Sequence, residues 1–111
     1  DGSPPVAMAF TSEIDGIAHL EEIDVHPDVS GKGIGSELLD AVCAIAQVSG
    51  YRAITLSTLT DVPWNAPFYA KRGFRILAPD ELTPGLVALQ RREAMGGFPM
   101  HLRVIMRREL A

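Results

Sequence analysis

The sequence predicts an α/β domain built on a mixed sheet, and three observations support this. Two strand-like runs flank the turn sequence Ile14-Asp15-Gly16, which is typical of an antiparallel hairpin. A strand, a glycine-rich loop, a helix and another strand follow one another over residues 17–57, and a crossover helix implies a parallel pair. Near the C-terminus Leu102, Val104 and Met106 alternate as in a half-buried strand.

The first two strands are expected at residues 6–13 and 17–25. In the second strand Leu20 and Ile23 are an odd number apart, so strict alternation would put them on opposite faces. An extra residue near Glu21 and Glu22 would bring both apolar side chains to one face. We therefore expect a β-bulge there.

The clearest helix follows the glycines and ends at Gly50. Its apolar residues recur at helical spacing: Ile34, Leu38, Leu39, Val42, Ile45 and Ala46. After it we expect a strand at 53–57, a short helix that ends near Arg72 and Gly73, a strand at 74–77, a helix at 83–95 and the last strand.

Composition indicates one globular domain over residues 1–111, with 47% hydrophobic and 22% charged residues. A net charge of −4 gives no general attraction to nucleic acid or to anionic membranes, so we expect neither as a partner. No apolar run is long enough to span a bilayer, and one cysteine excludes an internal disulfide. We expect a cytoplasmic protein.

The N-terminus suggests a chain that starts partway through a longer protein. It lacks an initiator methionine and opens with the turn-like residues Asp-Gly-Ser-Pro-Pro. The first strand would also leave the largely apolar edge at residues 6–10 unpaired, which favours pairing or aggregation. We expect an upstream segment, or a homo-oligomer, to complete the sheet.

Three glycines, Gly31, Gly33 and Gly35, open the strongest helix directly after a strand. Glycine lets a backbone approach a ligand closely, and the free amides and dipole at a helix N-terminus attract anions. The loop is therefore a candidate site for a phosphate or pyrophosphate. A tight turn without a ligand is the alternative.

Two motifs extend this interpretation: Val-His-Pro-Asp-Val-Ser-Gly-Lys-Gly-Ile-Gly at 25–35 and Asn-Ala-Pro-Phe-Tyr-Ala-Lys-Arg-Gly-Phe at 65–74. In this order and spacing they resemble the GNAT superfamily of N-acetyltransferases, and the resemblance covers residues 6–108. It implies a mixed sheet with flanking helices, which splays open between the strands 17–25 and 53–57 to admit the pantetheine arm of acetyl-CoA. The family's first strand, two helices and second strand, which usually help form the acceptor site, have no counterpart here.

The resemblance also implies which residues bind the cofactor. They are Ile23, Asp24, Val25, Ser30, Gly31, Lys32, Gly33, Ile34, Gly35, Ser36, Asn65, Tyr69 and Arg72. Ser30 stands where the family usually has Gln or Arg. Val62 stands where an asparagine is often found, so Asn65 does not directly inherit that asparagine's contact.

The implied reaction is direct attack of a primary amine on the acetyl thioester, which needs a base and a donor for the leaving thiolate. Tyr69 matches the family's sulfur-side donor; packing beside Phe68 and Phe74 is the alternative role. Glu22 is our first candidate for the base and Glu21 the second, although strand carboxylates are usually solvated surface groups.

Other reactive residue types have ordinary explanations. Cys43 lies mid-helix among apolar neighbours and is expected in the core. The three histidines lack metal-ligand spacing, so no metal is expected. A catalytically silent acyl-CoA-binding or regulatory module remains the main alternative function. A nucleotide-binding domain has less support, because no Walker-type Gly-Lys-Ser/Thr is present.

Overall fold

The computed structural model describes residues 7–25, 33–59, 65–96 and 103–110. The elements are β1 (Ala7–Ile14), β2 (Ile17–Val25), α1 (Ile34–Val48), β3 (Ala53–Leu59), α2 (Asn65–Ala70), β4 (Arg75–Ile76), a 3₁₀ turn (Pro79–Glu81), α3 (Pro84–Met95) and β5 (Arg103–Glu109).

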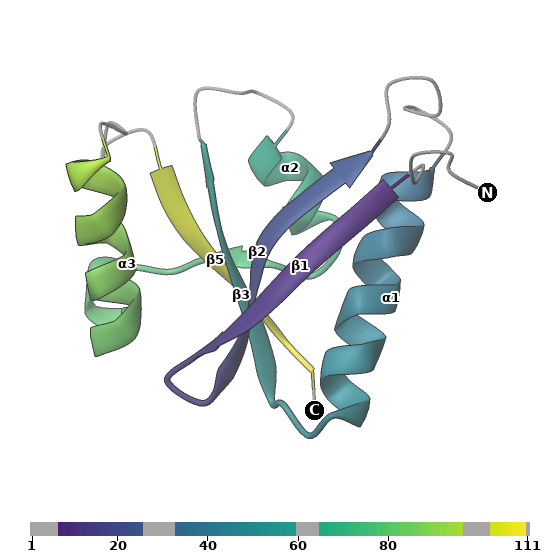
Figure 1. The fold of residues 1–111 in the computed structure, drawn as a ribbon, viewed down its shortest axis with the longest axis horizontal. Coiled ribbons are helices and arrows are strands. Elements are labelled where there is room, and N and C mark those ends of the chain that lie inside the picture. Colours follow the sequence, from purple (N-terminus) through teal and green to yellow (C-terminus); the bar gives the residue numbers. More distant parts are fainter. Residues whose placement is uncertain (1–6, 26–32, 60–64, 97–102, 111) are drawn as a thin grey trace.

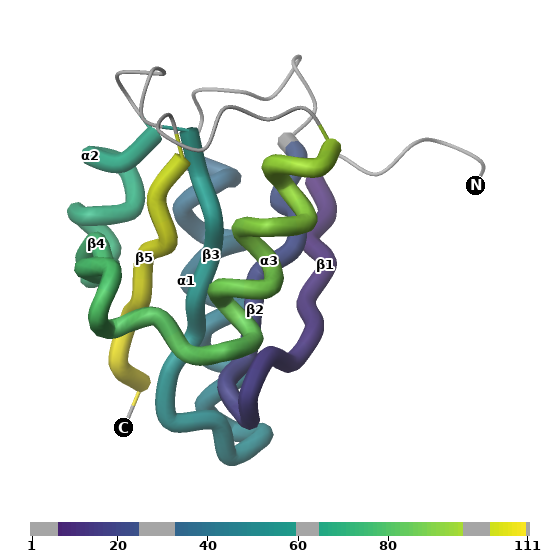
Figure 2. The backbone as a smooth tube through the Cα atoms, turned by 90° about the vertical axis from the view of Figure 1, so that its left-hand side faces the viewer, coloured from purple at the N-terminus to yellow at the C-terminus, as the bar shows by residue number. Residues whose placement is uncertain are grey.

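The strands form one mixed five-stranded sheet in the order β1-β2-β3-β5-β4. The β2–β3 pair is parallel and the other three pairs are antiparallel. The helix α1 covers one face and α3 the opposite face (Figures 1 and 2). The predicted α/β mixed sheet with flanking helices is therefore confirmed.

The hairpin between β1 and β2 closes through Asp15 and Gly16, whose φ angles are 54° and 77°. Positive φ at both central residues is the requirement of a type I′ turn. Along the hairpin Phe10 pairs with Glu22 and Thr11 pairs with Leu20, so Glu21 is the extra residue of a bulge. The predicted bulge is confirmed. It brings both Leu20 and Ile23 to the core beneath α1.

The sheet opens where the bulge lies. Only three residue pairs join β2 to β3, and the last is Leu20 with Leu56. Beyond it β2 continues along β1 to Val25, whereas β3 continues along β5 to Leu59. The predicted splay between these two strands is confirmed, and Figure 1 shows the strands diverging above it.

His19 lies just before the strands separate and has a structural role in the sheet. Its side chain is 2% exposed, and a hydrogen bond of 2.8 Å joins its Nδ1 to Oγ1 of Thr55 on β3. Burial lowers its pKa. The histidine is therefore held in its neutral form by packing, as expected for a structural residue.

Two clusters of buried side chains hold the helices on the sheet. The larger cluster joins α1 and α2 to the sheet and contains Leu39, Ile54 and Cys43. Burial also raises the pKa of Cys43, which fits its predicted place in the core. The smaller cluster joins α3 to β5 through Leu86, Leu89 and Ile105.

At the C-terminal edge one strand is shorter than expected, and the strand order is one that was not predicted. The strand expected at 74–77 is reduced to Arg75–Ile76, paired with Arg107 and Met106 of β5. The last strand inserts between β3 and β4, an order that alternation of residues does not specify.

None of the described helices is long and apolar enough to cross a membrane.

Candidate functional site

The splay between β2 and β3 forms a cleft of about 500 Å³. Six of the predicted site residues line it together: Glu21, Glu22, Ile23, Asp24, Asn65 and Tyr69. The first four come from β2 and the last two from α2, which follows the far end of β3. The fold therefore brings residues that are about 45 positions apart into one hollow.

The three carboxylates of the cleft have different surroundings. Glu21 is the bulge residue, and its Oε1 accepts a hydrogen bond of 2.5 Å from the Ser12 hydroxyl on β1. Glu22 and Asp24 are two residues apart on one face of β2. A hydrogen bond with the Asp24 carboxyl, and repulsion from its charge, raise the pKa of Glu22 above its usual value. Glu22 therefore takes up a proton more readily than an ordinary glutamate.

Tyr69 contacts two aromatic rings and also lines the cleft. Its ring meets Phe68 and Phe74 edge to face, with centroid distances of 5.2 and 5.8 Å. It is half-buried, and burial raises the pKa of its phenol, so the hydroxyl keeps its proton at neutral pH. The two roles considered for Tyr69 are thus compatible, because packing fixes a ring whose side chain borders the cleft.

The first turn of α1 has amides available to a ligand. Gly33 is the N-cap residue in the left-handed conformation (φ 79°, ψ 3°), and no side chain caps the helix. Its carbonyl accepts from the Glu37 amide at 3.1 Å, whereas the amides of Ile34, Gly35 and Ser36 precede the first helical hydrogen bond. A β-carbon at Gly33 would meet nothing within 4 Å. The backbone is therefore open to a ligand at this point.

Arg72 joins this turn to α2. Its Nη2 donates to the Ser36 hydroxyl at 2.5 Å, and its Nε is buried without a partner among the described residues. A guanidinium beside an uncapped helix N-terminus suits an anion, because both attract negative charge. Tyr69 lies one turn before Arg72, so the same short segment borders both the cleft and the α1 N-terminus.

Some predicted residues are not described. Ser30, Gly31 and Lys32 lie outside the described residues. Val25 ends β2, but its side chain is not described. Of the predicted glycine loop, the structure describes residues 33–36.

Sequence reasoning missed a set of residues on the β3 and β5 side of the cleft. Ser57, Thr58 and Arg103 line it. Glu93 on α3 lies behind them, with Oε2 at 2.8 Å from Arg103 Nε and Oε1 at 3.0 Å from the Ser57 hydroxyl. No sequence pattern pointed to Arg103, because its place depends on which strand β5 joins.

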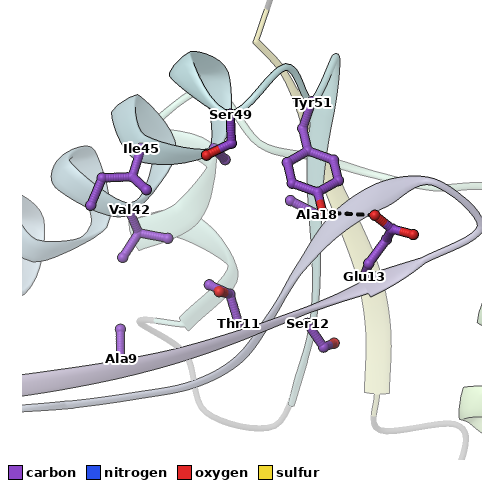
Figure 3. A pocket seen from close by; sticks show the side chains of 10 residues that line it. Ala9, Thr11, Ser12, Glu13, Ala18, Val42, Ile45, Ser49 and Tyr51 are labelled. Carbon is purple, nitrogen blue, oxygen red and sulfur yellow. Dashed lines mark hydrogen bonds between the residues drawn. The ribbon is translucent and has the colours of Figure 1, made fainter.

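A second hollow of about 450 Å³ lies on the other side of the hairpin, between β1 and the C-terminal half of α1 (Figure 3). Its floor is apolar and includes Ala18 and Val42. At its rim the Tyr51 hydroxyl donates to Glu13 at 2.7 Å. None of the predicted site residues lines this hollow. Across the described residues, no group of three or more potential metal ligands was found in the structure.

A family profile described as an acetyltransferase (GNAT) domain matches residues 4–76. The chain belongs to the GNAT acetyltransferase family. The match includes the strand, loop and helix of the first motif and the whole of the second.

Solved structures of this family have the same fold. A GNAT-family acetyltransferase from Staphylococcus aureus Mu50 aligns with a TM-score of 0.73 at 21% identity, over 96% of this chain and 60% of that one. The ribosomal-protein-S18-alanine N-acetyltransferase of Escherichia coli aligns with a TM-score of 0.69 at 18% identity, over 96% and 62%.

A curated relative is similar in sequence over a shorter stretch. It is the glucosamine 6-phosphate N-acetyltransferase of Trypanosoma brucei brucei, 32% identical over 66 residues, which are 60% of this chain and 43% of the relative. The chain thus spans less than two thirds of the length of these relatives.

Proposed function

We propose that this chain is the acyl-CoA-binding domain of an N-acetyltransferase, which transfers the acetyl group of acetyl-CoA to a primary amine. The observation that supports this most is the continuity between two parts of the site. Arg72 contacts the uncapped turn of α1, while Tyr69, three residues earlier, borders the cleft. A cofactor anchored by its pyrophosphate at α1 could therefore extend its thioester toward the cleft.

The residues present fit such a cofactor. The amides of residues 34–36 and the buried Nε of Arg72 are polar groups suited to a pyrophosphate. The exposed backbone of β2 at Ile23, Asp24 and Val25 would lie along the pantetheine arm, because β3 has separated there. Ser30, Gly31, Lys32 and Asn65 complete the proposed binding set through the family resemblance.

The proposed reaction forms a bond between the amine nitrogen and the acetyl carbonyl carbon and breaks the carbon–sulfur bond of the thioester. Glu22 accepts the proton of the attacking amine, directly or through water, and Glu21 is the second candidate. The Tyr69 hydroxyl donates to the leaving sulfur, which its raised pKa permits at neutral pH. The acetylated amine and CoA then leave.

Release of free CoA thiol from acetyl-CoA, measured over a panel of primary amines, tests this function. We expect amine-dependent release, lowered in Glu22→Gln. Binding of acetyl-CoA without turnover of any amine would instead favour the catalytically silent module.

We also propose that residues 1–111 are one domain whose β1 edge pairs with a further strand, from an upstream segment or from a second copy. The position of β1 at the end of the sheet supports this, because an edge strand offers unpaired backbone groups. Light scattering measures the oligomeric state and hydrogen exchange measures the protection of the β1 amides. A monomer whose β1 amides exchange slowly would contradict the proposal.

A further inference from the structure

The hairpin has an uncovered face beside the cleft, formed by Met8, Phe10, Glu22 and Asp24. The register pairs Phe10 with Glu22 and Met8 with Asp24. Side chains directly opposite each other in an antiparallel pair lie on one face, with β-carbons about 5 Å apart. Glu22 and Asp24, which line the cleft, therefore each have an apolar neighbour on the adjacent strand β1.

Phe10 and Met8 are exposed in this arrangement, with 52% and 38% of their surface accessible. The same face is covered by α3 only near the hairpin turn, where Ile14 packs against the cluster of Leu86 and Leu89. Along β1 the face thus changes from covered at Ile14 to open at Phe10 and Met8, the end beside the splay.

The described residues include four other exposed large apolar side chains. Those lie on α1, β4 and α3: Ile45, Val48, Ile76 and Met95. Ile45 and Val48 lie about one helical turn apart on α1 and are neighbours too. What distinguishes Phe10 and Met8 is that each lies opposite a carboxylate that lines the cleft. Here the apolar pair is contiguous with two carboxylates, so the surface suits a ligand that is apolar and cationic.

We propose that the acceptor is a hydrophobic primary amine, whose ammonium group lies at Glu22 and Asp24 and whose apolar body lies on Phe10 and Met8. This inference rests on the proposed function, since it names the substrate class of that site. Charge complementarity favours a cation, and an anionic group on the amine would be repelled by the two carboxylates. A bound ammonium would also relieve the repulsion between the two carboxylates.

Four probes test the proposal. Their binding is measured with the 111-residue chain saturated with CoA, and their turnover with the chain saturated with acetyl-CoA. The probes are 2-phenylethylamine, ethanolamine, O-phosphoethanolamine and the uncharged 2-phenylethanol. We expect kcat/KM to be highest for 2-phenylethylamine and lowest for the phosphorylated amine. Ligand-observed NMR should detect binding of 2-phenylethylamine but much weaker binding of 2-phenylethanol.

Matched variants identify the surface. Phe10→Ser should lower kcat/KM for 2-phenylethylamine by about tenfold, with little change for ethanolamine, because only the larger amine reaches the ring. Met8→Ser should act in the same direction. Ile76→Ser is the control, since Ile76 is also 52% exposed but lies at the opposite edge of the sheet. It should leave both values unchanged.

The outcomes separate this proposal from the proposed function. Turnover of all amines with equal efficiency, or selectivity unaffected by Phe10→Ser and Met8→Ser, would overturn the acceptor class and leave acetyl transfer standing. Binding of 2-phenylethylamine that is weakened in Phe10→Ser, without turnover of any amine, would support the surface and overturn the function. Absence of both binding and turnover would overturn both.

Discussion

The carboxylate of Glu93 on α3 lies 2.8 Å from Nε of Arg103 on β5, and both side chains are nearly buried, at 13% and 15% exposed. The same carboxylate accepts from the Ser57 hydroxyl on β3 at 3.0 and 3.1 Å. One acidic group thus links α3 to two strands at the wall of the cleft, in a low-dielectric setting where charge-assisted hydrogen bonds are strong.

We expect Glu93→Ala to destabilise the fold by about 3 kcal/mol, because it removes one partner of a largely buried ion pair. Urea denaturation measures the loss. Glu109→Ala is the matched control: Glu109 pairs with Arg107 at 2.7 Å, but those side chains are 56% and 26% exposed. It should cost much less. Equal losses in the two variants would show that burial of the Glu93 pair has no energetic consequence.

The order of elements was predictable from the sequence because it depends on local signals, whereas the splay was expected only from the resemblance to the GNAT superfamily. Asp15-Gly16 specifies the hairpin turn, and the odd spacing of Leu20 and Ile23 specifies the bulge. The bulge lies at the point where β2 leaves β3, directly after Leu20. The insertion of β5 between β3 and β4 was not predictable, since alternation gives a strand's faces but not its neighbours.

The residues of the candidate site also fall into two groups, those that the sequence could predict and those that it could not. Glu22, Asp24, Tyr69 and Arg72 could be proposed because they lie in or beside recognisable motifs. Arg103 and Glu93 could not, because their places follow from long-range packing of β5 and α3. The link between Arg72 and Ser36 was also hidden, although both were candidates, since it depends on how α2 approaches α1.

Gly85→Ala should lower stability by about 1–3 kcal/mol, the usual cost of overpacking. In most helices this change is stabilising. Here a β-carbon at Gly85 would lie 2.5 Å from Ile14 Cγ2, and the Gly85 amide donates to Asp15 at 2.7 Å, so α3 begins directly on the hairpin turn. Thermal unfolding followed by circular dichroism checks the sign; a raised melting temperature would contradict the close packing.

Tyr69→Phe should lower kcat by roughly 10–10⁴-fold with little change in cofactor affinity, because the ring packing persists while the donor to the leaving sulfur is lost. Steady-state kinetics and calorimetric titration with CoA measure the two effects. Tyr51→Phe is the control, since that hydroxyl donates to Glu13 outside the cleft. A Tyr69→Phe enzyme with unchanged kcat, where chemistry limits turnover, would return Tyr69 to a packing role alone.

Asp24→Asn should shift the acidic limb of kcat/KM to lower pH. Asp24 raises the pKa of Glu22, so below that raised pKa the wild-type base is protonated while the variant's base remains charged. The ratio of variant to wild-type kcat/KM should therefore increase as pH falls, and the amine's own titration cancels in this ratio. A ratio that stays constant with pH would argue that Glu22 is not the base.

Calorimetric titration of acetyl-CoA into Gly33→Ala and Gly50→Ala tests the central claim most directly, namely that the cofactor's pyrophosphate binds the open backbone at the start of α1. The two glycines are matched: φ is 79° at Gly33 and 95° at Gly50, and a β-carbon at each meets nothing within 4 Å. Both variants should therefore lose similar stability from backbone strain. We expect acetyl-CoA affinity at least about tenfold weaker in Gly33→Ala, where the new methyl group blocks close approach, and unchanged in Gly50→Ala. Wild-type affinity in a folded Gly33→Ala protein would contradict the claim.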